Sequence, residues 1–222
     1  MKDIRIRFEK TGRARYISHL DLTRAMTRAV RRAGLPIWYT EGFNKHPYLT
    51  FAAPLSLGFE GTDESMDLRL LEELPMEELV RRMNAVLPDG LHATGAGEPV
   101  HKAGELAAAR YRLTFTGDVS RMADFLAQES IPAEKRTKKG GVKTIDLKPS
   151  LTGARWEETG DGALTMEVIL PCSSAETINP SLIAAAYNAF VVNGGEPAVS
   201  CPVLRTAVLR TALYAADGTL FK

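Results

Sequence analysis

The side chains with the clearest chemical potential lie between positions 15 and 46, and most of them are cationic. Arg24, Arg28 and Arg31 follow one another at spacings of four and three residues, so in a helix they share one face. Like charges at this spacing repel, and the planar guanidinium group matches the oxygens of phosphate. The row therefore predicts phosphate binding, with Arg15 and Arg32 beside it. The alternative is a solvated helix face, or one paired with acidic residues of the same chain.

The segment that follows, residues 38–51, is unusually aromatic. It holds five of the 16 aromatic residues of the chain within 14 positions. Rings such as Phe43 can stack on unpaired bases, while Asn44, Lys45 and His46 contact the backbone or ribose. The pattern favours an RNA-contacting loop. The alternative is that the rings fill the core beneath a long loop.

Two histidines, His19 and His46, are candidates for catalysis, with Tyr39 as a possible assistant. Imidazole titrates near neutral pH, so such a pair can supply an acid and a base. A metal site would need a third ligand, and none is evident, so we expect no metal. A single histidine in a basic loop is more typical of binding than of cleavage. The sequence therefore favours a protein without catalytic activity of its own.

A second basic segment, KRTKKGGVK at 135–143, has five cations in nine residues and no acidic residue. We interpret it as a mobile loop in which Lys138 and Lys139 contact phosphate; the alternative is a solvated hairpin tip. In the next motif, IDLKPSL at 145–151, Asp146 and Lys148 fall on the same side of a strand. They form either a surface pair or part of a site.

Helices and strands must position these residues, and the hydrophobic periodicity predicts which ones. In the first half we expect strands at 4–8, 49–58 and 65–71, helices at 19–33 and 76–87, and an extended segment at 91–100. In the second half we expect strands at 111–117, 142–147, 163–170 and 208–215, helices at 120–128 and 180–191, and a further strand in GARWEET. The β-α-β-β-α-β order predicts an α+β fold of two tandem ferredoxin-like halves with antiparallel sheets. Their expected limits are 1–103 and 104–222.

The formal net charge of +1 over 222 residues conceals an asymmetry along the chain. Residues 1–50 hold 11 Lys+Arg and 4 Asp+Glu, a net charge of +7, whereas residues 51–100 hold 3 and 10, a net charge of −7. Such blocks produce either a polarised surface or two segments that pair with each other.

Cys172 and Cys201 lack metal-binding spacing, and we interpret them as reduced thiols of a cytoplasmic protein, with a disulfide as the alternative. No apolar run of about 18 residues predicts a membrane span, and the N-terminus is not typical of a signal peptide.

The stretch RYISHLDLTRAMTRAVRRAGLPIWYTEGFNKHPYLTFAAPLSLG closely resembles the opening of the radical SAM-linked protein family, a bacterial family of unknown function. The shared parts are the aromatic-Ile-Ser-His-Leu-Asp segment, the basic helix, the G-F-N-x-H-P loop and the apolar strand ending in Leu-Gly. Lys45 stands where proline is more expected. IDLKPSL also looks like a motif of that family.

The resemblance implies a radical SAM partner protein. The genetic neighbourhood of that family hints at RNA, but the resemblance assigns no activity. The chain lacks a C-x-x-x-C-x-x-C motif for an iron–sulfur cluster, so it is not the radical enzyme, and we expect no cofactor. Tandem ferredoxin-like halves with a basic helix also look like the RNA-processing endonucleases of CRISPR systems, by fold analogy alone.

The leading hypothesis is an RNA-binding accessory protein that presents structured RNA (tRNA or rRNA) to that partner. The alternatives are a metal-independent endoribonuclease using His46, a protein-interaction module that docks on the radical SAM partner, and a binder of a small anionic ligand.

Overall fold

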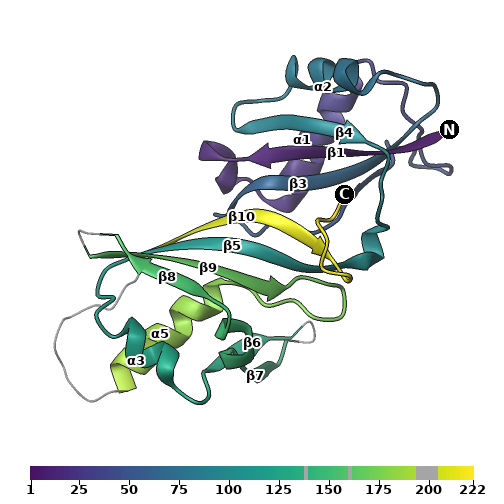
Figure 1. Ribbon diagram of the computed structural model, residues 1–222. Coiled ribbons are helices and arrows are strands. Elements are labelled where there is room, and N and C mark those ends of the chain that lie inside the picture. Colours follow the sequence, from purple (N-terminus) through teal and green to yellow (C-terminus); the bar gives the residue numbers. More distant parts are fainter. Residues whose placement is uncertain (138–139, 160–161, 194–204) are drawn as a thin grey trace. The chain divides into compact units, whose positions relative to one another are not determined.

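The computed structural model describes residues 1–137, 140–159, 162–193 and 205–222 (Figure 1). The fold class is mixed α+β with mostly antiparallel strand pairing, as the sequence predicts. The chain separates into two compact units, one of residues 1–108 with 209–222 and one of residues 109–208. Within the described part of the chain, no helix is long and apolar enough to cross a membrane.

The first unit holds the arginine row and the aromatic segment. Its elements are β1 (Lys2–Lys10), the 3-10 helix η1 (Gly12–Tyr16), α1 (His19–Arg32), β2 (Leu49–Phe51), β3 (Glu60–Leu70), α2 (Met76–Asn84), β4 (Leu91–Gly97) and η2 (Ala103–Glu105), with parts of β5 (Leu106–Thr116) and β10 (Arg205–Ala215). The strands lie in the order β4-β1-β3, and β2 pairs with β3. These contacts are antiparallel, whereas β10 pairs with β3 in parallel through Leu209 and Arg210.

Helix α1 forms where the periodicity predicts it. The Ser18 hydroxyl accepts the backbone N–H of Asp21 at 3.1 Å and so caps the first turn. The helix ends before Gly34, whose φ of +61° is the left-handed conformation that glycine adopts easily. Its buried face consists of Leu22, Met26, Ala29 and Val30. The opposite face therefore carries the arginines.

One hydrophobic core joins both helices of the first unit to its sheet. Alternate residues of β1 and β3 point into it, because successive side chains of a strand face opposite sides. The core includes Ile4, Ile6 and Phe8 of β1, Met66, Leu68 and Leu70 of β3, Leu91 and Ala93 of β4, Leu79 and Met83 of α2, and the buried face of α1, together with Ala14, Leu35 and Ile37. This packing fixes α1 against the sheet and leaves its polar face outward.

The second unit contains the remaining elements. They are α3 (Met122–Ala127), β6 (Pro132–Arg136), β7 (Val142–Asp146), α4 (Lys148–Leu151), β8 (Arg155–Glu158), β9 (Ala163–Pro171) and α5 (Ser181–Asn193), with most of β5 and the start of β10. The sheet order is β10-β5-β9-β8. Figure 1 shows α3 and α5 on one side of β5, β8 and β9. Cys172 is buried, and Cys201 lies outside the described residues.

The elements predicted from periodicity all have counterparts, but the strand expected at 49–58 covers only Leu49–Phe51, and Lys148, expected on one strand with Asp146, begins α4 instead. Two additional elements occur in the second unit. Strand β6 and helix α4 were not expected, and β6 pairs with β7 in a separate two-stranded sheet. Apolar periodicity missed β6 because its sequence, PAEKR, is mostly polar and has only one buried residue. The tandem ferredoxin-like arrangement therefore stays a prediction. The domain limits 1–103 and 104–222 also stay a prediction.

Candidate functional site

Three of the predicted arginines lie on the exposed face of α1. Arg24, Arg28 and Arg31 are all exposed, as their spacing predicts. Arg24 forms an ion pair with Asp21 at 3.2 Å, but both side chains are more than half exposed, so the pair holds Arg24 weakly. Arg28 has no hydrogen-bonding or ion-pair partner among the described residues. The row is therefore only partly neutralised by the chain itself.

Two other arginines are directed to partners within the chain. Arg15 forms an ion pair with Glu60 at 2.8 Å, and its Nε donates to the carbonyl of Gly12 at 3.0 Å. Arg32 donates from Nη2 to the carbonyl of Val86 at 2.6 Å, beyond the end of α2. Both guanidinium groups already have hydrogen-bond or ion-pair partners within the chain, so they contribute less to an anion site than Arg28 and Arg31.

The aromatic segment 38–48 folds back on itself as an irregular hairpin. The backbone N–H of Tyr48 donates to the carbonyl of Trp38 at 3.1 Å, and that of Thr40 donates to the carbonyl of His46 at 2.9 Å. The rings of Trp38 and Tyr48 meet edge to face at 5.7 Å, and the guanidinium group of Arg69 lies over both rings. The base of the hairpin is therefore held by aromatic packing on β3.

The tip of this hairpin presents its side chains to solvent. Phe43 is fully exposed, with a relative accessibility of 109%, and Lys45 beside it is exposed as well. Gly42 has a φ of +113°, a conformation that other residues avoid, and this turn carries the chain to the tip. A fully exposed phenylalanine gains nothing from core burial, and this is the feature expected of a surface that receives another ring.

His46 is held in one orientation by its own loop. Its Nδ1 lies 2.9 Å from the carbonyl oxygen of Asn44 and 3.1 Å from the hydroxyl of Thr40. A carbonyl oxygen only accepts, so Nδ1 carries the proton in the neutral ring and Nε2 is the acceptor nitrogen. The imidazole can thus accept a hydrogen bond from a ligand hydroxyl, or donate to phosphate when it is protonated.

A cation–π contact joins the helix to the hairpin. The guanidinium carbon of Arg31 lies 5.6 Å from the centre of the Tyr39 ring, which is 37% exposed. This contact joins exposed residues of α1 to exposed residues of the hairpin, and we call these residues together the helix–loop surface. Its members are Arg28, Arg31, Tyr39, Phe43, Lys45 and His46. The structure therefore brings together one part of the arginine row and the tip of the aromatic loop.

His19 occupies a different environment from His46. Its ring meets Phe51 of β2 edge to face at 5.1 Å, and its Nδ1 is buried without a hydrogen-bond partner in the described part of the chain. Burial lowers the pKa of His19, and the nearby charge of Lys10 lowers it further. No contact joins the His19 and His46 rings among the described residues, so the structure does not show them as an acid–base pair.

The acidic segment neutralises the basic strand β1 rather than α1. Asp67 accepts two hydrogen bonds from Arg5, at 2.6 and 2.7 Å, and Asp63 pairs with Arg7. These pairs follow from the antiparallel register of β1 and β3, which sets Arg5 opposite Asp67. The alternative in which residues 1–50 pair with the acidic residues 51–100 therefore holds for β1 and for Arg15. It leaves Arg28, Arg31 and Lys45 without a carboxylate partner in the described residues.

The second basic segment is only partly described. Lys138 and Lys139 lie outside the described residues. Strands β6 and β7 flank them and pair from Pro132 with Asp146 to Arg136 with Val142. Both interpretations of the two lysines stay predictions.

Sequence reasoning missed a second group of exposed or half-buried residues. Arg110, Ser150, Gly153 and Arg155 border a hollow of about 510 Å³ in the second unit. The available signal was the pair of alternating arginines in ARYR, at 109–112, together with the arginine in GARW, at 153–156, because residues two apart in a strand share a face.

The chain is thus a mixed α+β protein whose helix–loop surface is exposed, basic and aromatic. Residues 3–180 match the DUF2344 family, described as an uncharacterised protein conserved in bacteria. The chain belongs to this family. The match includes α1, the hairpin at 38–48 and the IDLKPSL motif. No curated protein matches the chain.

Proposed function

We propose that this protein binds RNA through the helix–loop surface and presents it to a partner radical SAM enzyme. Arg28, Arg31 and Lys45 contact phosphates, and the ring of Phe43 stacks on an unpaired base. His46 contacts ribose or phosphate. The observation that carries the proposal is the fully exposed Phe43 beside cations that have no carboxylate partner in the described residues.

The chemistry of the surface supports a nucleic acid over other anions. A small anion needs only charge, whereas this surface combines spaced guanidinium groups with exposed rings. Single-stranded and looped RNA offers both counterparts, because its phosphates recur along the chain and its unpaired bases expose flat faces. Structured RNA with an unpaired loop, as in tRNA or rRNA, is therefore the proposed class.

Binding is favoured over cleavage because none of the described hydrogen bonds of His46 reaches a second acid or base. Its hydrogen bonds go to Thr40 and Asn44, which belong to the same loop. Metal-independent cleavage needs both an acid and a base at the scissile phosphate. His46 is therefore assigned to binding in this proposal.

Salt-dependent binding tests the RNA proposal. Arg28→Gln/Arg31→Gln is compared with wild type for a fluorescently labelled tRNA between about 50 and about 300 mM KCl. Removing two phosphate contacts should weaken binding at least about tenfold at low salt and reduce the slope of log affinity against log salt by about two. Arg81→Gln/Arg82→Gln, on α2, is the matched control, because Glu78 holds both of these arginines.

Equal affinity and equal slope in the two double variants would exclude the helix–loop surface as the RNA site.

The radical SAM partner is supported by the sequence resemblance alone. Co-purification of the two proteins after nuclease treatment tests this link. Co-purification without RNA affinity would favour a protein-interaction module instead.

A further inference from the structure

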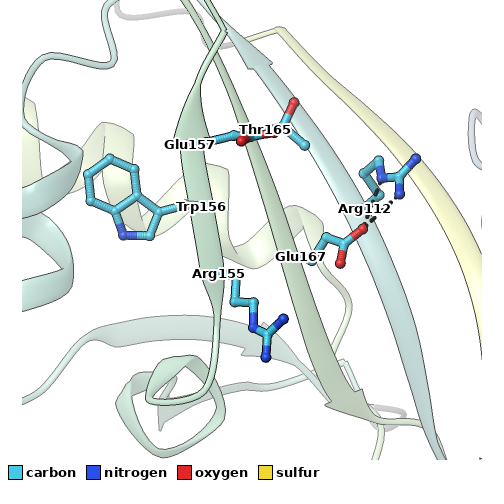
Figure 2. Close-up of a pocket in the computed structure, with 6 residues that line it drawn as sticks. All are labelled: Arg112, Arg155, Trp156, Glu157, Thr165 and Glu167. Carbon is cyan, nitrogen blue, oxygen red and sulfur yellow. Dashed lines mark hydrogen bonds and ion pairs between the residues drawn. The ribbon is translucent and has the colours of Figure 1, made fainter.

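The second unit carries two shallow hollows that meet on one face of its sheet. One, of about 510 Å³, is lined by Arg110, Pro149, Ser150, Gly153, Arg155, Glu167, Val168 and Ile169. The other, of about 490 Å³, is lined by Arg112, Arg155, Trp156, Glu157, Thr165 and Glu167 (Figure 2). Arg155 and Glu167 belong to both. The volumes are in the range of small-ligand sites.

Arg155 is the unneutralised charge at the junction of the two hollows. It lies opposite Glu167 in the antiparallel register of β8 and β9. Glu167, however, accepts two hydrogen bonds from Arg112 on β5, at 3.1 and 2.8 Å. Figure 2 shows the Arg155 guanidinium group pointing away from that pair. Arg155 has no ion-pair partner among the described residues, so its charge is available to a ligand.

The IDLKPSL motif shapes the wall of the larger hollow. Asp146 accepts the backbone N–H groups of Ile131 and Lys148 at 2.8 and 2.9 Å, and the Lys148 ammonium donates to the carbonyl of Leu126 at 2.7 Å. These contacts hold α4 in place, and Ser150 and Gly153 then border the hollow. The charged residues of the motif therefore position the wall rather than bind a ligand.

We propose that these hollows bind a phosphate group of a nucleotide. The phosphate sits between Arg155 and Arg110, the hydroxyl of Ser150 donates to it, and the base lies in the adjoining hollow. Two guanidinium groups and a hydroxyl are the donors that phosphate recognition uses. The phosphate comes either from a free nucleotide or from an RNA backbone. This site does not depend on the helix–loop surface.

Isothermal titration calorimetry provides a direct test. Adenosine 5′-monophosphate should bind saturably, whereas adenosine should not, because adenosine lacks the phosphate. Arg155→Gln should weaken binding about tenfold, the usual effect of losing a charge-assisted hydrogen bond. Arg81→Gln, which removes an exposed charge from α2, should leave binding unchanged.

A short single-stranded RNA identifies the source of the phosphate. Competition with adenosine 5′-monophosphate, at higher affinity and with the same dependence on Arg155, indicates an RNA backbone; failure to compete indicates a free nucleotide. The proposal is overturned if neither probe binds saturably, if adenosine binds equally well, or if Arg155→Gln behaves like Arg81→Gln. Arg28→Gln/Arg31→Gln should leave nucleotide binding intact, which separates this site from the proposed RNA surface.

Discussion

His19 illustrates how one residue of the signature segment acts inside the fold. Its ring packs on Phe51, which in turn meets Phe8 at 6.1 Å, so it closes one end of the core beneath α1. Its buried Nδ1 has no partner among the described residues. A second proton on this ring would place a cation near Lys10, itself buried, and burial already lowers the pKa of Lys10. The fold therefore favours the neutral imidazole.

This preference predicts how stability depends on pH. The pKa of His19 is lowered in the folded chain, so between the unfolded value near 6.5 and the folded value the unfolded chain binds more protons. The contribution of His19 to the free energy of unfolding is thus complete above pH 6.5 and is lost as the pH falls towards the folded pKa. Urea denaturation at several pH values should show a smaller loss for His19→Gln than for wild type. Parallel curves for the two proteins would refute this role.

At the scale of elements, α1 depends on its N-terminal cap as well as on its apolar face. The Ser18 hydroxyl accepts the N–H of Asp21 and donates to the Asp21 carboxylate at 2.7 Å. The latter bond, followed by the nearby Arg24, holds the pKa of Asp21 below its usual value. The negative charge of Asp21 in the first turn is also stabilised by the positive pole of the helix dipole.

Loss of this cap should therefore be measurable. Ser18→Ala should lower the free energy of unfolding by about 1 kcal/mol, because a backbone N–H of the first turn loses its acceptor. Ser18→Thr retains a hydroxyl and should cost less. Urea denaturation at neutral pH compares the three proteins. If Ser18→Ala and Ser18→Thr have the same stability, the hydroxyl is not the cap that the structure indicates.

At the scale of the whole chain, a buried ion pair connects two distant parts of the first unit. Arg210 of β10 donates to both carboxylate oxygens of Glu64 in β3, and to the carbonyl of Ala53 at 2.9 Å. Both side chains are almost completely buried, at 1% and 3% exposure. Their 146-residue separation makes this contact a product of tertiary structure.

Breaking this pair should be costly. Arg210→Met leaves a buried carboxylate without its counter-charge and should lower the free energy of unfolding by about 3–5 kcal/mol. Arg210→Met/Glu64→Leu removes both charges and should recover much of that loss. Arg81→Met, in an exposed pair, should cost far less than Arg210→Met. Chemical denaturation measures all three, and a double variant no more stable than Arg210→Met would contradict this account.

The sequence by itself determined the local elements and the outward face of α1. Periodic burial, the serine cap and Gly34 are all local signals, so they predicted the extent of this helix closely. Aromatic clustering likewise indicated the loop that carries Phe43. Strand β6 was missed because its polar sequence has no apolar alternation to detect.

Only the tertiary structure decided which charges are available to a ligand. Arg15 is neutralised by Glu60, and Arg32 donates a hydrogen bond to a carbonyl 54 residues away, whereas the Arg28 guanidinium keeps no partner in the described part of the chain. Arg155 has no ion-pair partner in the described residues because Arg112 takes the carboxylate opposite it. The reason is physical: local periodicity encodes which face a side chain occupies, but partners across a sheet depend on strand register, which is set when distant segments pack together.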